Sequence, residues 1–144
     1  MPHEFHTKRK IEFVDTDLAG VVHFSRFFIF METAEHEFLR SLGTSVAAKM
    51  DGMQLGWPRL SASCEYLSPA RFEDVLDIHV IVVKKGTKSI TYKFIINKDG
   101  TLIARGQMVS VCCLVDPEKG FRTIPLPGFL VEQIQAAPAG EIRE

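Results

Sequence analysis

The sequence predicts an α+β domain in which one long central helix is wrapped by a curved antiparallel sheet. Residues 24–42 have the periodicity of a helix, because apolar side chains recur there at intervals of three and four. From Trp57 onward the apolar period changes to two, and turn residues separate several strand-like runs. A helix followed by a run of consecutive antiparallel strands is typical of this fold class.

The composition is that of one globular domain. The chain has 144 residues, of which 46% are hydrophobic, enough for a sizeable core. A net charge of −1 argues against a nucleic-acid partner. We expect neither a signal peptide nor a membrane span, because MPHEFHTKRK has no apolar core and no apolar run reaches about 18 residues. We therefore expect one domain over residues 1–136 and a flexible tail over residues 137–144.

The cysteines and motifs exclude several kinds of chemistry. Cys64, Cys112 and Cys113 are odd in number and lack the spacing of metal ligands, so we expect reduced thiols and a cytoplasmic protein. A Gly-rich phosphate loop, a zinc motif and a G-x-S-x-G motif are absent. The sequence therefore does not support nucleotide hydrolysis, zinc chemistry or a serine hydrolase.

The N-terminal third predicts a strand, a turn and the helix. Residues 4–14 read as a strand, and two carboxylates followed by Gly20 indicate a turn. The helix would run from Ser25 to Leu42 and end at Gly43, a length of about 27 Å. Its stripe, about 120° wide, contains Phe24, Phe27, Phe28, Met31, Glu35, Phe38, Leu39 and Leu42. Ile29 and Phe30 lie off the stripe, so we expect an enclosed helix.

The rest of the chain predicts a meander. Residues 44–56 would form a short connection with one helical turn at 46–50. The predicted strands are 59–66, 75–83, 89–96, 101–115 and 121–124, with a hairpin at Asp99-Gly100 and a helical segment at 128–136. In the first strand, Leu60, Ala62, Cys64 and Tyr66 would form the buried face. Because such a sheet has long edges, we expect them to pair across a two-fold axis in a homodimer with a continuous sheet.

One segment carries a resemblance to a known family. VDTDLAGVVHFSRFFIFMETAEHEFLRSLG resembles the N-terminal signature of hotdog-fold acyl-CoA thioesterases, the 4-hydroxybenzoyl-CoA thioesterase family. The likeness is strongest over residues 11–42 and continues more weakly along most of the chain. It implies the hotdog fold, a dimer or tetramer, and a short-chain or aromatic acyl-CoA as substrate.

The turn before the helix is the predicted catalytic site. A carboxylate at Asp17 would lie beside the unpaired N–H groups of a helix start, where an oxyanion could also be held. Asp17 could attack a thioester carbonyl or activate water, although its spacing also fits a turn or helix-capping aspartate. The resemblance implies that Asp17 carries catalysis and that the N–H of Phe24 polarises the carbonyl. Asp15 is expected to be structural, accepting backbone hydrogen bonds.

Each of the other candidate site residues has more than one interpretation. His23 departs from the family pattern, and it could orient water or simply stand at the helix entry. Glu32 could contact substrate or be solvated. Glu35 on the apolar stripe could have a buried hydrogen-bond partner or contact a second subunit, or it could contact substrate. We expect Phe27 and Met31, with neighbours of Trp57, to line an acyl pocket at a subunit interface.

A CoA thioester also needs cations for its phosphates. Lys84, Lys85 and Lys88 cluster at a predicted turn, with Arg71 as a further candidate, although a charged turn can serve solubility alone. We expect no metal and no cofactor other than the CoA of the substrate. The predicted activity is hydrolysis of a short-chain or aromatic acyl-CoA to a free acid and CoA. The alternatives are a hotdog acyl-thioester hydratase or dehydratase, using Asp17 with His23, and a non-catalytic acyl-CoA binding module.

Overall fold

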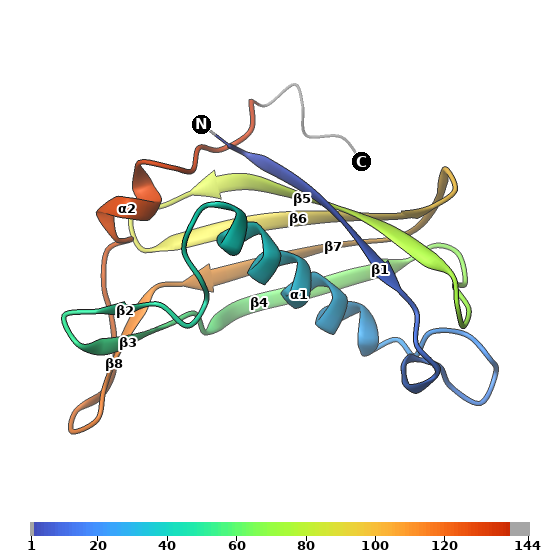
Figure 1. The fold of residues 1–144 in the computed structure, drawn as a ribbon, viewed down its shortest axis with the longest axis horizontal. Coiled ribbons are helices and arrows are strands. Elements are labelled where there is room, and N and C mark those ends of the chain that lie inside the picture. The colour runs from blue at the N-terminus through green and yellow to red at the C-terminus, as the bar shows by residue number, and fades with distance from the viewer. Residues whose placement is uncertain (1, 139–144) are drawn as a thin grey trace.

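The computed structural model describes residues 2–138, and these form two antiparallel sheets and one long helix. Figure 1 shows the strands of the larger sheet curling over helix α1 (Arg26–Ser41), which lies across their concave face. The smaller sheet extends from one end of the larger one (Figure 1). This arrangement agrees with the predicted helix and wrapping sheet.

The larger sheet has the strand order β1-β5-β6-β7-β4. Its strands are β1 (Glu4–Lys10), β4 (Arg59–Tyr66), β5 (Val75–Lys85), β6 (Ser89–Lys98) and β7 (Thr101–Val111). The Asp99-Gly100 turn joins β6 to β7 as predicted, with both residues at positive φ. The first strand is shorter than predicted, because the chain leaves the sheet after Lys10 and forms the 3-10 helix η1 (Phe13–Asp15).

The smaller sheet corrects two predictions. It consists of β2 (Lys49–Met50), β3 (Met53–Gly56), β8 (Cys113–Asp116) and β9 (Gly120–Thr123). The helical turn predicted at 46–50 is present only as a single hydrogen-bonded turn, from Ala48 N to Ser45 O, because β2 and β3 pair as a hairpin from Lys49 onward. The long strand predicted at 101–115 is divided at Cys112, whose N–H bonds Lys88 O while its carbonyl accepts from Ile124 N. The chain thus passes from one sheet to the other at this residue.

Helix α1 packs through a face that largely matches the predicted stripe, although Phe30 and Ala34 are buried as well and Phe24 is not. Its buried residues are Phe27, Phe30, Met31, Ala34, Glu35, Phe38 and Leu39. Phe24 precedes the helix and is 62% exposed, and Ile29 is also exposed, so the helix is not enclosed on every side. It approaches the sheet closely at Gly106 of β7, where an added Cβ would lie 2.2 Å from the Met31 sulfur. Gly43 ends the helix as predicted, with φ +84°.

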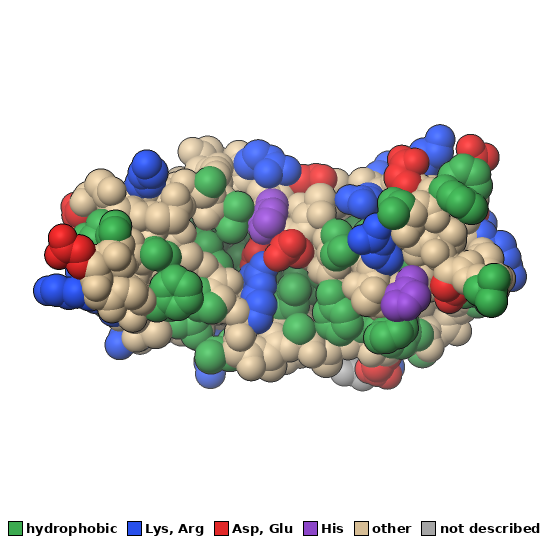
Figure 2. All heavy atoms as spheres, turned by 90° about the horizontal axis from the view of Figure 1, so that it is seen from below, with side chains coloured by type: hydrophobic (Ala, Val, Ile, Leu, Met, Phe, Trp, Pro, Cys, Tyr) green, Lys and Arg blue, Asp and Glu red, His purple; other side chains and the backbone are tan. Residues whose placement is uncertain are grey.

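Strand β4 is an edge strand with little burial, which corrects the half-buried face predicted for it. Leu60 is 71% exposed and Tyr66 is 47% exposed. The sheet offers no neighbour to β4 beyond β7, because β4 ends the strand order. In Figure 2, the side of the molecule on which α1 and β4 lie carries hydrophobic side chains between charged ones.

The C-terminal segment contains a short helix and an ordered end. Helix α2 (Gly128–Val131) is shorter than the predicted segment 128–136. Ala137 is buried, and its N–H bonds Val82 O at 2.8 Å, so the predicted flexible tail does not begin there. Residues 139–144 of that tail lie outside the described residues. Among residues 2–138, no helix combines the length and apolar character needed to cross a membrane.

Candidate active site

A tight turn between η1 and α1 holds Asp17. The backbone N–H of Asp17 bonds Val21 O, and the N–H of Gly20 bonds Asp17 O, with Gly20 at φ +80°. Because L side chains rarely adopt such a positive φ, glycine suits this position. The Asp17 carboxylate oxygen Oδ1 accepts from Ala19 N at 2.9 Å and Val21 N at 3.4 Å. Among the described residues, Oδ2 has no hydrogen-bond partner, so one oxygen is anchored while the other is available.

Asp15 stabilises the turn from within, which confirms its predicted structural role. It is 1% exposed, and its Oδ2 accepts from the N–H of Glu12 at 2.8 Å. Arg26 at the start of α1 lies 3.2 Å from its other carboxylate oxygen. The N–H of His23 also bonds the backbone carbonyl of Asp15. The turn is thereby fastened to the helix entry.

The helix start leaves backbone N–H groups available. Ser25 is the N-cap residue, but its side chain makes no capping hydrogen bond to the helix. Its hydroxyl instead lies 2.8 Å from His23 Nδ1. Within the described part of the chain, the N–H of Phe24 has no acceptor. Because the N-terminal end of a helix carries partial positive charge, this region can hold a developing negative charge.

A cavity of about 370 Å³ opens between the turn, the start of α1 and the end of β4. Asp17, Phe24 and Phe27 line it together with Val21 and Val22. The opposite wall is the end of β4 and the loop after it, residues 66–70. Backbone bonds hold this loop in place, because Val22 N–H bonds Ala70 O and Val21 pairs with Arg71. The structure therefore brings three of the predicted site residues together.

Tyr66 joins the two walls of the cavity. Its hydroxyl donates to Phe24 O at 2.9 Å, and its ring meets the Phe27 ring edge-on at 5.4 Å between centroids. The sequence analysis placed Tyr66 on a buried strand face and missed this contact. A possible signal is its position at the end of a strand that stops at Ser68-Pro69, but only the fold brings that end to the helix.

Some predicted site residues lie outside the cavity lining. His23 is exposed, stacks on Phe24 with ring centroids 4.6 Å apart and hydrogen-bonds Ser25. Met31, predicted to line the acyl pocket, is fully buried against Gly106 instead. Trp57 is partly buried against the core and does not line this cavity either.

Glu32 and Glu35 both lie near Arg59. Glu35 is 1% exposed, and Arg59 donates to both of its oxygens, at 2.6 and 2.7 Å. The Ser110 hydroxyl adds a third hydrogen bond at 3.1 Å. The prediction that Glu35 has a buried hydrogen-bond partner is thus confirmed. Glu32 is exposed, and it lies 3.6 Å from Arg59 rather than in the cavity lining.

The predicted phosphate-binding lysines lie at the far end of the sheet within this chain. Lys84, Lys85 and Lys88 belong to the β5–β6 hairpin beside α2, whereas the cavity lies at the start of α1 (Figure 1). Lys85 donates to the carbonyls of Val131 and Ile134, so it stabilises the C-terminal segment. Arg71 follows the lining residue Ala70 directly and is exposed.

Cys64 does not supply a second nucleophile near this end of β4. Partial burial raises the pKa of its thiol to about 11. The thiol is therefore protonated at neutral pH, and the thiolate is the nucleophilic form. Asp17 remains the anionic side chain of the cavity lining.

Comparison with known proteins identifies relatives over most of the chain. The model of the thioesterase-like superfamily matches residues 11–134. An acyl-CoA thioester hydrolase, YbgC, of Escherichia coli is 32% identical over 127 residues, which are 88% of this chain and 92% of that protein. A hypothetical protein of known structure from Aquifex aeolicus is 29% identical, with a TM-score of 0.82 over 91% of this chain and 99% of its own.

A third comparison establishes the fold. The 4-hydroxybenzoyl-CoA thioesterase of Pseudomonas sp. strain CBS-3 superposes with a TM-score of 0.81 over 92% of this chain and 99% of its own. Its sequence is 22% identical, so this likeness concerns the fold. The predicted hotdog fold of the α+β class is confirmed.

Proposed function

The chain belongs to the thioesterase-like superfamily, and we propose that it hydrolyses the thioester of a short-chain or aromatic acyl-CoA to a free acid and CoA. That its relatives include acyl-CoA thioester hydrolases supports thioester hydrolysis as the reaction. The observation that carries the proposal is one cavity in which the Asp17 carboxylate and the Phe24 backbone share the lining. A nucleophile or base and an oxyanion donor are the two groups that acyl transfer requires.

Asp17 is the proposed base or nucleophile. As a base it takes a proton from water, whose oxygen adds to the thioester carbonyl carbon. As a nucleophile it forms a mixed anhydride that water then hydrolyses. In both routes the C–S bond breaks and CoA leaves as the thiolate, which then takes up a proton. The anchored Oδ1 supports either role, because it fixes the carboxylate while Oδ2 remains available.

The Phe24 N–H is the proposed oxyanion donor. A preorganised donor of this kind is worth about 3–4 kcal/mol in other enzymes that stabilise a tetrahedral intermediate. The missing side-chain cap at Ser25 supports this role, because the Ser25 hydroxyl does not compete for the N–H groups at the helix start.

The cavity walls support a compact or aromatic acyl group. Phe27 and Tyr66 present aromatic surface, and the volume of about 370 Å³ is that of a small-ligand site. Arg71, next to the lining, is the proposed contact for a CoA phosphate. Glu32, Lys84, Lys85 and Lys88 remain candidates for substrate contacts, and His23 for orienting water. None of these steps calls for a metal or a further cofactor, and we propose that the reaction takes place in the cytoplasm.

A second copy of the chain is the proposed partner. The β4 edge carries the small, uncharged side chains of Ser61, Ala62 and Ser63, whereas Lys8 and Lys10 on β1 protect the other edge. If two β4 strands pair antiparallel about Ala62–Ser63, Leu60 of one copy lies opposite the cavity end of β4 in the other. Ser63→Lys would then yield a monomer in sedimentation analysis. A dimer that survives this change would exclude β4 pairing.

Thiol release from a panel of aliphatic and aromatic acyl-CoAs tests the activity. Asp17→Asn is expected to lower kcat at least about 100-fold, since it removes the base or nucleophile. Asp77→Asn is the matched control, because Asp77 lies in the sheet, partly exposed, and pairs with Lys8. An Asp17→Asn variant with unchanged turnover, or a wild type that binds acyl-CoA without turnover, identifies a binding module instead.

The hydratase alternative predicts a different product. It requires His23 to act together with Asp17, and water would add to a double bond of an enoyl-CoA. Incubation of the same protein with enoyl-CoA separates the two reactions, because hydration consumes the double bond without releasing thiol. The hydrogen bond between His23 and Ser25 favours the hydrolase, because it already engages Nδ1 of the ring.

A further inference from the structure

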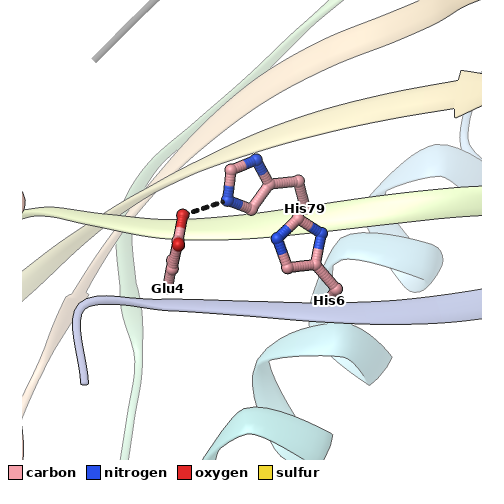
Figure 3. A group of neighbouring side chains, drawn as sticks. All are labelled: Glu4, His6 and His79. Carbon is pink, nitrogen blue, oxygen red and sulfur yellow. Dashed lines mark hydrogen bonds and ion pairs between the residues drawn. The ribbon is translucent and has the colours of Figure 1, made fainter. Parts of the chain in front are cut away.

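A cluster of three metal-ligating side chains lies on β1 and β5. The antiparallel register sets His6 directly opposite His79. Glu4 precedes His6 by two residues, so it lies on the same face of the strand. Figure 3 shows the three side chains converging, with the two imidazole rings side by side and the Glu4 carboxylate turned toward His79.

The cluster is compact. One ligand atom from each residue lies within 4.8 Å of the others. Glu4 Oε2 is 2.7 Å from His79 Nε2, and the two rings stack with centroids 4.0 Å apart and planes 13° apart. Ligands bound at about 2.0–2.1 Å in a tetrahedral zinc site lie about 3.3 Å from one another. The rings would have to turn out of their stack so that one nitrogen of each points at the same ion, which these solvent-accessible side chains can do at the expense of one surface hydrogen bond.

We propose that Glu4, His6 and His79 bind one divalent transition-metal ion, with Zn²⁺ as the reference ion. Neutral imidazole nitrogens and a carboxylate oxygen are typical zinc ligands. Two histidines also favour a borderline transition metal over Mg²⁺ and Ca²⁺, which prefer oxygen ligands. Three protein ligands leave one tetrahedral position for water.

The location assigns the ion a structural role. His6 alternates along β1 with Phe5 and Thr7, which face α1 and contact Phe38 and Glu37 there. The cluster is therefore on the face of the sheet turned away from α1 and from the cavity that Phe24 and Phe27 line. An ion held by both strands would fasten the edge strand β1 to β5. Because the ion would bind the folded chain, it would also raise the free energy of unfolding.

Zinc titration of the untagged protein against a chromophoric chelator tests the site. We expect one Zn²⁺ per chain, and binding at least about tenfold weaker in His79→Asn and in Glu4→Gln, since a lost ligand costs at least as much as a lost outer-shell partner. His36→Asn is the matched control, because His36 lies on α1 outside the cluster. Its zinc affinity is expected to equal that of the wild type. Equal affinity in all four proteins, or the same loss in His36→Asn, would overturn the proposal.

Thermal unfolding supplies a second readout that does not depend on enzymatic activity. Zinc is expected to raise the Tm of the wild type and of His36→Asn, and to leave the Tm of His79→Asn unchanged. Mg²⁺ at the same concentration is expected to have no effect. An equal rise with Mg²⁺, or with zinc in His79→Asn, would contradict a transition-metal site at these residues. Circular dichroism of each variant verifies that the fold is retained.

Discussion

Arg59 on β4 and Glu35 on α1 form a two-point ion pair, with Nη1–Oε2 and Nη2–Oε1 distances of 2.6 and 2.7 Å. It joins the central helix to the exposed edge strand, which otherwise has few buried contacts. Glu35 is buried, so it depends on Arg59 and on Ser110 for compensation.

Arg59→Met should destabilise the fold, because it leaves the Glu35 carboxylate buried without its charge partner. We expect a loss of about 3 kcal/mol in the free energy of unfolding, measured by urea denaturation. The double variant Glu35→Leu/Arg59→Leu should recover part of this loss, because neither charge remains. Equal stability of the single and double variants would show that the charge is not what matters here.

Tyr66→Phe tests the link between the two cavity walls. The ring remains, but the hydrogen bond to Phe24 O is lost. A hydrogen bond of this kind contributes about 1 kcal/mol. If this bond positions the Phe24 N–H for the oxyanion, kcat should fall by about fivefold while KM changes little. A change confined to KM would indicate that Tyr66 contributes to substrate binding alone.

Arg71→Ala tests which cation binds the CoA phosphates. Because Arg71 adjoins the cavity lining, the variant should raise KM for acyl-CoA and weaken its dependence on salt. Within one chain, Lys84→Ala and Lys88→Ala should have no such effect, because their hairpin lies at the other end of the sheet. A larger effect from the lysines than from Arg71 would instead place the hairpin of a second copy at the cavity.

Gly106→Ala tests the close packing of the helix on the sheet at Met31. Its Cβ would lie 2.2 Å from Met31 Sδ and 2.9 Å from Ser63 O, so the helix or the edge strand has to shift. We expect a loss of about 1–3 kcal/mol in thermal or urea unfolding. Gly128→Ala is the control, because no heavy atom lies within 4 Å of the added carbon. Equal stability of both variants would refute the close packing.

The lowered pKa of Asp74 predicts how the stability of the fold changes in acid. Hydrogen bonds from Lys98 and from the Arg71 N–H lower its pKa, against the opposing effect of partial burial. The pKa of Asp74 is lower in the folded chain than the unfolded value of about 3.9. The ionised carboxylate therefore contributes fully to the free energy of unfolding at neutral pH, and this contribution is lost as the pH falls through the folded pKa. Asp74→Asn should therefore be less stable than the wild type at pH 7, and the difference should vanish at about pH 2. A difference that is independent of pH would exclude this carboxylate as its source.

The helix, the turn and the β6–β7 hairpin were predictable because they depend on local signals. The strand order was not, since a simple meander would pair β4 with β5, whereas β4 pairs with β7. Gly20 and Gly43 mark the ends of segments, and Asp99-Gly100 marks a hairpin regardless of what packs on it. The exposure of β4 was not predictable from alternation, since a period of two identifies a strand but not whether both of its faces meet the rest of the chain. That depends on the position of the strand in the sheet.

The lining residues on one side of the cavity could also be predicted from local sequence. Asp17, Phe24 and Phe27 are close in sequence, so local reasoning found them. Residues 66–70 reach the cavity through the backbone pairing of Val21 and Val22 with Ala70 and Arg71, about fifty positions along the chain. The pairing of Arg59 with Glu35 is equally non-local, and the sequence indicated only that Glu35 needed some partner.

Two aromatic residues of the cavity walls, Phe24 and Tyr66, lie outside the hydrophobic core, whereas Phe27 belongs to both. Phe24 and Tyr66 are largely exposed, whereas Phe30, Phe38 and Phe94 are fully buried. Replacing a residue of the first group changes the shape offered to an acyl chain while removing little of the packing that holds the molecule together. Substrate preference can therefore diverge between descendants of one ancestor without a corresponding loss of stability.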